Sequence, residues 1–316
     1  MDVTDGQRKL LELCAIRIDR DSVDWSLIAR QVQLADGLAM LRKGVILEKS
    51  AAAKRSLRIL RRGLQNPAGL AERVGIELAA ASEAGARLVT VLDQDYPANL
   101  RMIPNLPPFL FVRGELAEAD ARSVAVVGTR DASADGIRRA GRMSRLLAEQ
   151  DVTVISGLAK GIDTAAHRAA LEAGGRTIAV LGTGITKCYP SQNRELAEEI
   201  TRAGALVSQF WPTRSPGRDT FPRRNVVTSG LSQGTVVIEA SSTSGAKMQA
   251  RLALEHGKKV FLLESLATSQ QWARTYIRER GAIEVADVDE VIRHLAPPDR
   301  IRQATEQQQQ LSLALL

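Results

Sequence analysis

The sequence is poor in the residues that build metal centres, disulfide frameworks and membrane spans. Its 316 residues include two cysteines, Cys14 and Cys188, and three histidines, His167, His256 and His294. They are scattered, so the spacings typical of a zinc site, redox motif or disulfide framework are missing, and we expect both thiols to be reduced. No apolar run approaches the roughly 18 residues needed to cross a bilayer, and the N-terminal stretch lacks the apolar segment of a signal peptide. We therefore expect a cytoplasmic protein with no metal, no other cofactor and no membrane partner.

Two common nucleotide-binding fingerprints are also missing. The pattern G-x-x-x-x-G-K-[ST] does not occur, which disfavours a P-loop ATPase. The segment "GTGITK", residues 182–187, fails G-x-G-x-x-G at its last glycine, which argues against a dinucleotide site. Aromatic residues make up only 3% of the chain, so few rings are available for stacking on a ligand.

Candidate catalytic groups are few, and each has a structural alternative. Asp163 and His167 lie four residues apart on one expected helix face, where they form either an acid/base pair or a helix-stabilising contact. The helix-stabilising contact is favoured. Glu239 follows an expected buried strand, and the sequence leaves open whether it is catalytic or a partner for nearby arginines. No Ser/His/acid set stands out as a triad.

The charge that is present is placed unevenly. Residues 121–225 carry 16 basic and 10 acidic groups, a balance of +6, whereas residues 1–120 have a balance of +1 and residues 226–316 a balance of zero. Such a basic segment indicates a polyanion surface, most simply for nucleic acid, although a solvated basic face that aids solubility fits equally well. The run "KRSLRILRR", residues 54–62, predicts a basic helical face, for which a solvated role is favoured over phosphate contact.

The apolar pattern predicts an α/β protein. Residues 1–84 show helical spacing, and from residue 122 short apolar strands alternate with amphipathic helices, which indicates a mostly parallel sheet with helices on both faces. The expected strands of this part are 124–127, 153–155, 177–181, 205–207, 235–238 and 259–263. We predict a small helical domain at 1–84, a core at 85–296 and a flexible tail at 297–316, because 297–309 is polar and poor in apolar residues.

The loops after the expected strands share one composition of glycines, hydroxyls and a cation. In an open parallel sheet these loops meet at one edge, where helix N-termini also point, so the recurrence favours phosphate binding over catalysis. The candidate residues in these loops are Gly128, Thr129, Arg130, Ser156, Gly157, Lys160, Gly161, Gly182, Thr183, Gly184, Lys187, Asn193, Ser244, Gly245 and Lys247.

Several motifs in order identify a family resemblance. The segments "VAVVGTR", "SGLAKGIDTAAHRAALEAGG", "YPSQNRELAEEI", "FPRRNVVTSGLS" and "VVIEASSTSGAKMQARLALEHGKKVF" resemble the DNA-processing protein A (DprA/Smf) family over about residues 86–263. The resemblance implies an extended Rossmann-like fold and no enzymatic step. It also implies binding of single-stranded DNA, a homodimer, and loading of the recombinase RecA in transformation or recombination.

Carried onto this sequence, the family's DNA-contacting motifs fall on four places. They are Gly128 to Arg130, the loop 156–163 with Lys160, the segment 221–225 with Phe221, Arg223, Arg224 and Asn225, and the loop Ser244, Gly245 and Ala246. Of the two adjacent arginines, we expect Arg224 to be the one buried against Glu239 or Asp163. Phe221, Tyr189 and Trp211 are the expected stacking candidates near these loops.

Two further hypotheses remain open. The tail "QQLSLALL" places Gln310, Leu311, Leu313 and Leu315 behind a polar segment and resembles peptides that dock on the replication sliding clamp, although a helix end or dimer contact is favoured. The second is a nucleotide-binding or nucleotide-hydrolysing enzyme or sensor. A related enzyme signature, Gly-Gly-x-Gly-Thr just before a glutamate, is matched only loosely by Gly230, Gly234, Thr235 and Glu239, which favours DNA.

Overall fold

The computed structural model describes residues 1–19, 21–297, 299–301, 303–304 and 307. Its helices are α1 (Asp5–Ala15), α2 (Trp25–Gln31), α3 (Gly37–Arg42), α4 (Ala51–Gly63), α5 (Pro67–Glu83), α6 (Ala98–Arg101), α7 (Ala134–Ala148), α8 (Ile162–Glu172), α9 (Arg194–Ala203), α10 (Thr220–Leu231), α11 (Gly245–Glu255), α12 (Glu264–Ser269), α13 (Gln271–Arg280) and α14 (Val288–Ile292), with short 3₁₀ turns η1 (Glu118–Ala121) and η2 (Ser191–Asn193). No helix in this described part is long and apolar enough to cross a membrane.

The strands form one large sheet and one small ribbon. The strands are β1 (Arg17–Ile18), β2 (Asp21–Ser22), β3 (Arg87–Thr90), β4 (Phe109–Gly114), β5 (Ser123–Val127), β6 (Thr153–Ser156), β7 (Thr177–Val180), β8 (Ala205–Ser208), β9 (Gly234–Val237), β10 (Lys259–Leu263) and β11 (Ile283–Val285). The large sheet has nine strands in the order β11-β10-β9-β5-β6-β7-β8-β4-β3. All its neighbours are parallel except at one edge, where β4 runs antiparallel to both β8 and β3.

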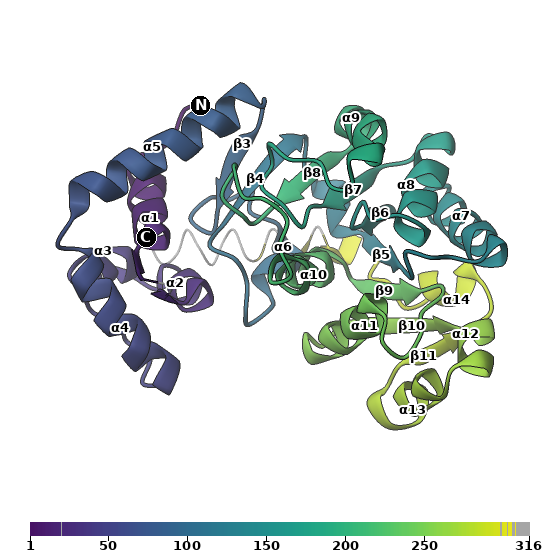
Figure 1. The fold of residues 1–316 in the computed structure, drawn as a ribbon. Coiled ribbons are helices and arrows are strands. Elements are labelled where there is room, and N and C mark those ends of the chain that lie inside the picture. Colours follow the sequence, from purple (N-terminus) through teal and green to yellow (C-terminus); the bar gives the residue numbers. More distant parts are fainter. Residues whose placement is uncertain (20, 298, 302, 305–306, 308–316) are drawn as a thin grey trace.

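Helices cover both faces of this sheet. Helices α7, α8 and α9 pack on one face, and α6, α10 and α11 pack on the other. Helices α1–α5 form a separate helical part, at the left of Figure 1. Strands β5, β6 and β7 are buried along their whole length, as expected for parallel strands covered on both faces. The predicted α/β fold with a mostly parallel sheet is therefore confirmed.

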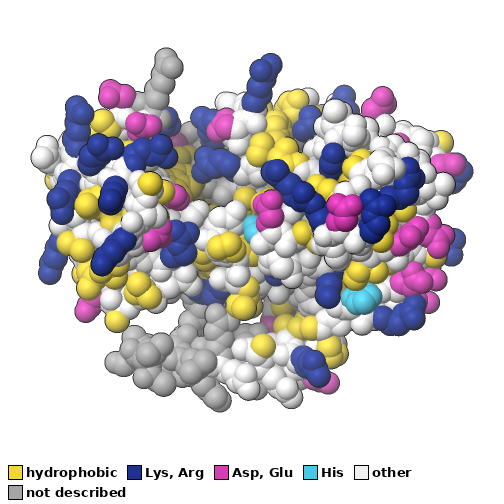
Figure 2. Space-filling view, turned by 90° about the horizontal axis from the view of Figure 1, so that it is seen from below, with side chains coloured by type: hydrophobic (Ala, Val, Ile, Leu, Met, Phe, Trp, Pro, Cys, Tyr) yellow, Lys and Arg dark blue, Asp and Glu magenta, His cyan; other side chains and the backbone are white. Residues whose placement is uncertain are grey.

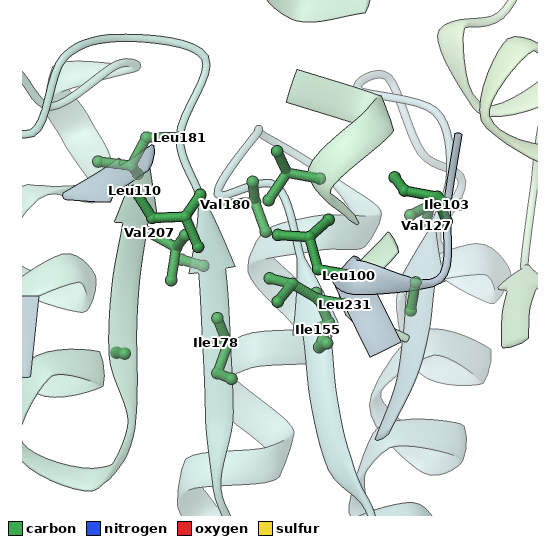
Figure 3. Close-up of a cluster of buried hydrophobic side chains, with 14 of the residues drawn as sticks. Leu100, Ile103, Leu110, Val127, Ile155, Ile178, Val180, Leu181, Val207 and Leu231 are labelled. Carbon is green, nitrogen blue, oxygen red and sulfur yellow. The ribbon is translucent and has the colours of Figure 1, made fainter. Parts of the chain in front are cut away.

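A continuous apolar core joins the sheet to the segment that precedes it. Leu100 of α6 and Ile103 just after it lie in one cluster with strand residues such as Val127 and Ile155 and with Leu231 at the end of α10 (Figure 3). This cluster fixes α10 against the sheet, so the first turn of α10 is held beside the strand ends.

The boundary that we predicted between the helical part and the core falls near a change of structure, since α5 ends at Glu83 and β3 begins at Arg87. The division at 84 remains a proposal. Of the predicted flexible tail 297–316, the described residues 299–301, 303–304 and 307 have helical backbone. Gln310, Leu311, Leu313 and Leu315 lie outside the described residues.

Candidate nucleic-acid interface

A pocket of about 320 Å³ opens at the carboxyl ends of the parallel strands, and we call it the strand-end pocket. It is built from the loops after β5, β6 and β9 and from the first turns of α8, α10 and α11. Its lining residues are Val127, Gly128, Thr129, Arg130, Gly157, Ala159, Asp163, Phe221, Pro222, Arg224, Asn225, Thr228, Ser241, Ser244, Gly245, Ala246, Met248 and Gln249. Helix N-termini and glycine-containing loops meet here, an arrangement that suits a phosphate group.

The loop after β6 is fixed by two buried polar side chains. The Asp163 carboxylate accepts the backbone N–H groups of Gly157 at 3.2 Å and Ala159 at 3.3 Å. The Asn193 amide donates to the carbonyl of Leu158 at 2.9 Å and to the hydroxyl of Thr164 at 2.9 Å. Asn193 is buried and its amide N–H groups serve the loop, so the structure gives this predicted DNA contact a supporting role.

Close backbone approach joins the loops after β5 and β6. Gly161 has φ +74°, and a Cβ added there would lie 2.6 Å from the carbonyl oxygens of both Thr129 and Arg130. Only glycine fits such a position without strain or displacement. The Ile162 N–H donates to the Thr129 carbonyl at 3.3 Å, so α8 begins directly against the loop that carries Arg130.

Arg224 forms part of the pocket wall, and its guanidinium is held by backbone carbonyls. The side chain is 8% exposed, and Nη1 donates to the carbonyls of Gly157 at 2.6 Å and Val180 at 3.0 Å. Burial lowers the pKa of Arg224, and the nearby Asp163 opposes that shift. Burial likewise raises the pKa of Asp163, opposed mainly by Arg224. Arg224 is thus a fixed positive charge in the wall, bonded to carbonyls and not to either predicted carboxylate.

The rim of the strand-end pocket combines exposed cations with two aromatic rings. The Arg130 guanidinium lies 4.9 Å from the Phe221 ring centroid, and the Phe221 and Tyr189 centroids are 5.8 Å apart. Tyr189 is 45% exposed, so this pair offers a ring surface to a ligand. Lys160 and Lys187 are exposed, and neither they nor Arg130 form an ion pair with any described residue.

Some predicted contacts lie away from this pocket. Arg223 points to the helical part of the molecule, with its guanidinium 5.0 Å from the Trp25 ring and 5.3 Å from the Phe210 ring. The Lys247 ammonium lies 5.9 Å from the ring of Trp272. The fully buried Ser156 hydroxyl donates to the Val126 carbonyl at 2.7 Å, and so braces β5 against β6.

The aromatic prediction is wrong for one of the three rings. Trp211 is 9% exposed and packs 5.1 Å from the Phe109 ring and 6.2 Å from the Trp25 ring. It stabilises the contact between the core and the helical part. Phe221 and Tyr189 are therefore the rings available beside the strand-end pocket.

The candidate acid/base groups are engaged in internal hydrogen bonds. His167 does not contact Asp163 but pairs through Nδ1 with the Thr177 hydroxyl at 2.7 Å, and burial, aided by Arg224, lowers its pKa to about 3. The Glu239 carboxylate accepts the Ser133 hydroxyl at 2.7 Å and the Ser133 N–H at 3.3 Å. Ser133 in turn caps α7, so Glu239 supports a helix start.

Sequence reasoning missed several lining residues on α10 and α11. Thr228 lies one turn after Arg224, and Gln249 lies one turn after Gly245, so helical periodicity starting from the predicted residues points to both. The Gln249 amide is buried, and neither of its polar atoms has a partner among the described residues.

Comparisons with known proteins identify relatives of this chain. The family model described as DNA recombination-mediator protein A matches residues 87–296. Protein Smf of Synechocystis sp. is 40% identical over 189 residues, which cover 58% of this chain and 48% of the relative, so the match spans about half of that relative's length. The structure of DNA processing protein A from Streptococcus pneumoniae aligns with a TM-score of 0.71 at 28% identity, covering 94% of this chain and all of that one.

A second solved structure shares the fold at lower identity. DNA processing protein A from Helicobacter pylori, for which a single-stranded DNA binding mode is described, aligns with a TM-score of 0.59 at 23% identity. This alignment covers 66% of the present chain and 94% of that protein. The likeness shows a common fold.

Proposed function

Since the chain belongs to the DNA recombination-mediator protein A family, we propose that it binds single-stranded DNA by its backbone in the strand-end pocket. The observation that carries the proposal is the union, in one pocket, of helix N-termini, the fixed charge of Arg224 and the unpaired rim cation Arg130. We propose that Lys160, which follows the lining residue Ala159, and Lys187, two residues before Tyr189, also contact the strand. Gly128, Thr129, Gly157, Asn225, Ser244 and Gly245 line the pocket and let a strand approach the backbone.

The ring pair at the rim supports a single strand as the ligand. Unpaired bases stack on exposed aromatic rings, whereas the bases of a duplex are already stacked on each other. The rings of Phe221 and Tyr189 lie beside the cation Arg130, so base stacking and phosphate contact can occur together. Because few rings are present, backbone contact dominates and we expect little sequence preference.

The salt dependence of binding tests this proposal. We expect Arg130→Gln and Lys160→Gln each to weaken binding of labelled oligonucleotides of every sequence, measured by fluorescence anisotropy. Each substitution should also reduce the slope of log affinity against log salt by about 0.7, the value for one phosphate contact on a single strand. Arg278→Gln, on the exposed part of α13 and paired with Glu279, is the control and should bind like the wild type. Salt-independent binding by the wild type would exclude backbone contact.

We further propose that the bound strand is passed to RecA, in transformation or in recombination. The description of the family as a recombination mediator supports this step. The test is RecA-dependent ATP hydrolysis on single-stranded DNA coated with single-strand-binding protein, with and without this protein. Stimulation by the wild type and loss of stimulation with Arg130→Gln are expected, and equal rates in all three reactions would contradict the proposal.

Other partner proposals have separate tests. A homodimer is expected from the family resemblance and is tested by sedimentation. Docking of residues 310–316 on the sliding clamp is tested by comparing pull-down with the intact chain and with a chain ending at residue 308.

A nucleotide-hydrolysing enzyme is disfavoured because Asp163, His167 and Glu239 are each engaged in internal hydrogen bonds. Release of free base from nucleoside monophosphates would reverse that conclusion.

A further inference from the structure

A second hollow, of about 360 Å³, lies between the helical part and the core, and we call it the Trp25 pocket. Its lining residues are Cys14, Arg17, Ser22, Val23, Asp24, Trp25, Ser26, Arg73, Phe210, Trp211, Arg214, Asp219 and Arg223. The set includes four arginines and two aspartates, so the pocket has an excess of positive charge. Neighbouring residues of α10 line the two pockets, with Phe221, Pro222 and Arg224 at the strand-end pocket and Arg223 at this one.

Two of the four arginines already have polar partners. Arg73 donates to the Ala15 carbonyl at 3.1 Å, and Arg214 donates to both carboxylate oxygens of Asp219 at 3.0 Å. The second acid, Asp24, accepts the N–H of Ser26 at 2.9 Å and so caps α2. Both aspartates of the pocket are therefore occupied by local contacts.

The other two arginines keep their donors available. The guanidinium groups of Arg17 and Arg223 make no ion pair or hydrogen bond with another described residue, and the contact that Arg223 makes with Gln209 uses its backbone carbonyl. The Arg223 guanidinium lies against the rings of Trp25 and Phe210, at 5.0 Å and 5.3 Å from their centroids. Stacking uses the face of a guanidinium and leaves the N–H groups in its plane free to bind an anion.

Arginines of this kind favour a phosphate. A guanidinium matches two phosphate oxygens with two parallel N–H donors, and such charge-assisted hydrogen bonds are among the stronger ones in proteins. The aromatic rings hold the Arg223 side chain in place, which reduces the conformational entropy lost when the anion binds. The pocket therefore combines a pre-oriented donor with a second unpaired cation, Arg17, on β1.

We propose that the Trp25 pocket is a second phosphate site for the same DNA strand that occupies the strand-end pocket. This inference rests on the function proposed above. Phe221 and Arg223 lie two residues apart in the first turn of α10 and so point to opposite sides of the helix. An α-helix is about 10–12 Å wide with its side chains, so a short run of nucleotides that passes over this first turn spans both pockets. The strand thereby crosses the first turn of α10 and reaches the helical part of the protein at Arg17.

Binding as a function of oligonucleotide length tests the inference. We compare the wild type with the double variant Arg17→Gln/Arg223→Gln. For the shortest oligothymidylates that the wild type binds, we expect the variant to have the same affinity as the wild type. For longer strands it should lose about tenfold or more, and its salt slope should fall by about 1.4, the value for two phosphate contacts. Wild-type affinity at every length would overturn the proposal.

A control variant that loses the same charge elsewhere shows whether weaker binding comes from the Trp25 pocket or from the lower total charge of the protein. Arg55→Gln/Arg58→Gln removes two exposed cations from α4, in the same helical part, and neither arginine pairs with a described residue. Figure 2 shows Lys and Arg side chains gathered on the helical part of the molecule, at the left of this view. We expect the control to change affinity less than threefold at all lengths. An equal loss in both double variants would overturn the assignment to the Trp25 pocket, and thermal unfolding checks that both are folded.

Two further outcomes keep this inference distinct from the proposed function. If the wild type binds no single-stranded oligonucleotide at all, the proposed function fails. Binding of a nucleoside monophosphate to the Trp25 pocket can be followed by tryptophan fluorescence. If the wild type binds oligonucleotides, and the monophosphate saturates this pocket without competing with long strands, the pocket binds a free nucleotide. In that case the inference fails and the proposed function stands. Competition by the monophosphate for long strands but not for the shortest ones supports the shared strand.

Discussion

The strand-end pocket and the Trp25 pocket receive neighbouring arginines from one helix but hold them in different ways. Arg224 is buried and donates to two backbone carbonyls, those of Gly157 and Val180. Arg223 lies on the faces of Trp25 and Phe210 and keeps its donors free. The first arrangement builds the wall of a site, and the second presents a charge to a ligand. Two adjacent residues of one type thus have separate roles, set by what packs around each side chain.

The largest difference between the two regions should appear in folding stability. Arg224→Met leaves two buried carbonyls without a donor and Asp163 without its nearby cation, so we expect the free energy of unfolding to fall by about 3 kcal/mol. Arg223→Met keeps the aliphatic contact with the two rings and should cost less than about 1 kcal/mol. Urea unfolding followed by tryptophan fluorescence measures both. Equal losses would mean that the carbonyl contacts of Arg224 contribute little.

The substitution Gly157→Ala tests how tightly Arg224 packs against the loop after β6. A Cβ added at Gly157 would lie 1.7 Å from Nη1 of Arg224, so Gly157→Ala must displace the guanidinium or the loop. We expect a loss of about 2 kcal/mol, typical of overpacking in a closed site, together with weaker DNA binding. Gly245→Ala, at the same pocket, is the matched control for stability because its Cβ would meet no atom within 4 Å. If both substitutions leave stability unchanged, the wall is looser than the structure indicates.

The sequence predicted the sheet well because covered parallel strands leave a clear pattern. The expected strands at 124–127, 153–155 and 177–181 each lie within one residue of the observed ones, since their apolar runs are short and bounded by glycine or polar residues. Helix α10 was not predicted. It is packed between the sheet and α11, so it lacks a one-sided apolar stripe, and Pro222 stands in its first turn.

The sequence predicted many of the residues that line the strand-end pocket, but it did not predict how Arg223 and Asn193 are placed. Gly128, Thr129, Arg130, Gly157 and Arg224 meet in one pocket because the carboxyl ends of parallel strands share an edge, which the alternating pattern already implied. The separation of Arg223 from Arg224 depends on Trp25, which is almost 200 residues earlier in the chain. No local pattern carries that contact, and the same holds for the role of Asn193 as a brace for the loop after β6.

The last effect that we predict concerns pH: it is small near neutral pH and grows only as pH falls below about 6.5. It separates the framework of the strand-end pocket from the Trp25 pocket. His167 is fully buried near Arg224, and its Nδ1 must carry the proton, because the Thr177 hydroxyl it contacts already donates to the Val154 carbonyl at 2.7 Å. Its Nε2 is buried without a partner in the described part of the chain. Protonation of the folded protein would therefore place an unpaired charge in the core, which is why the pKa falls from 6.5 to about 3.

The sign of the effect follows from proton binding. Between about pH 6.5 and pH 3 the unfolded chain binds a proton at His167 and the folded protein does not, so the free energy of unfolding falls as pH is lowered, by up to about 1.4 kcal/mol per pH unit. His167→Asn keeps an N–H donor for Thr177 but cannot titrate, and its stability should fall less steeply over this range. His256 and Asp163 titrate in both proteins, so their contributions cancel in the comparison.

No histidine lines the Trp25 pocket, and the ratio of wild-type to Arg17→Gln/Arg223→Gln affinity for long strands should therefore be constant from about pH 5 to pH 8. Parallel stability curves for the wild type and His167→Asn would show that His167 is protonated in the folded state, and the separation of the two regions by pH would then be lost.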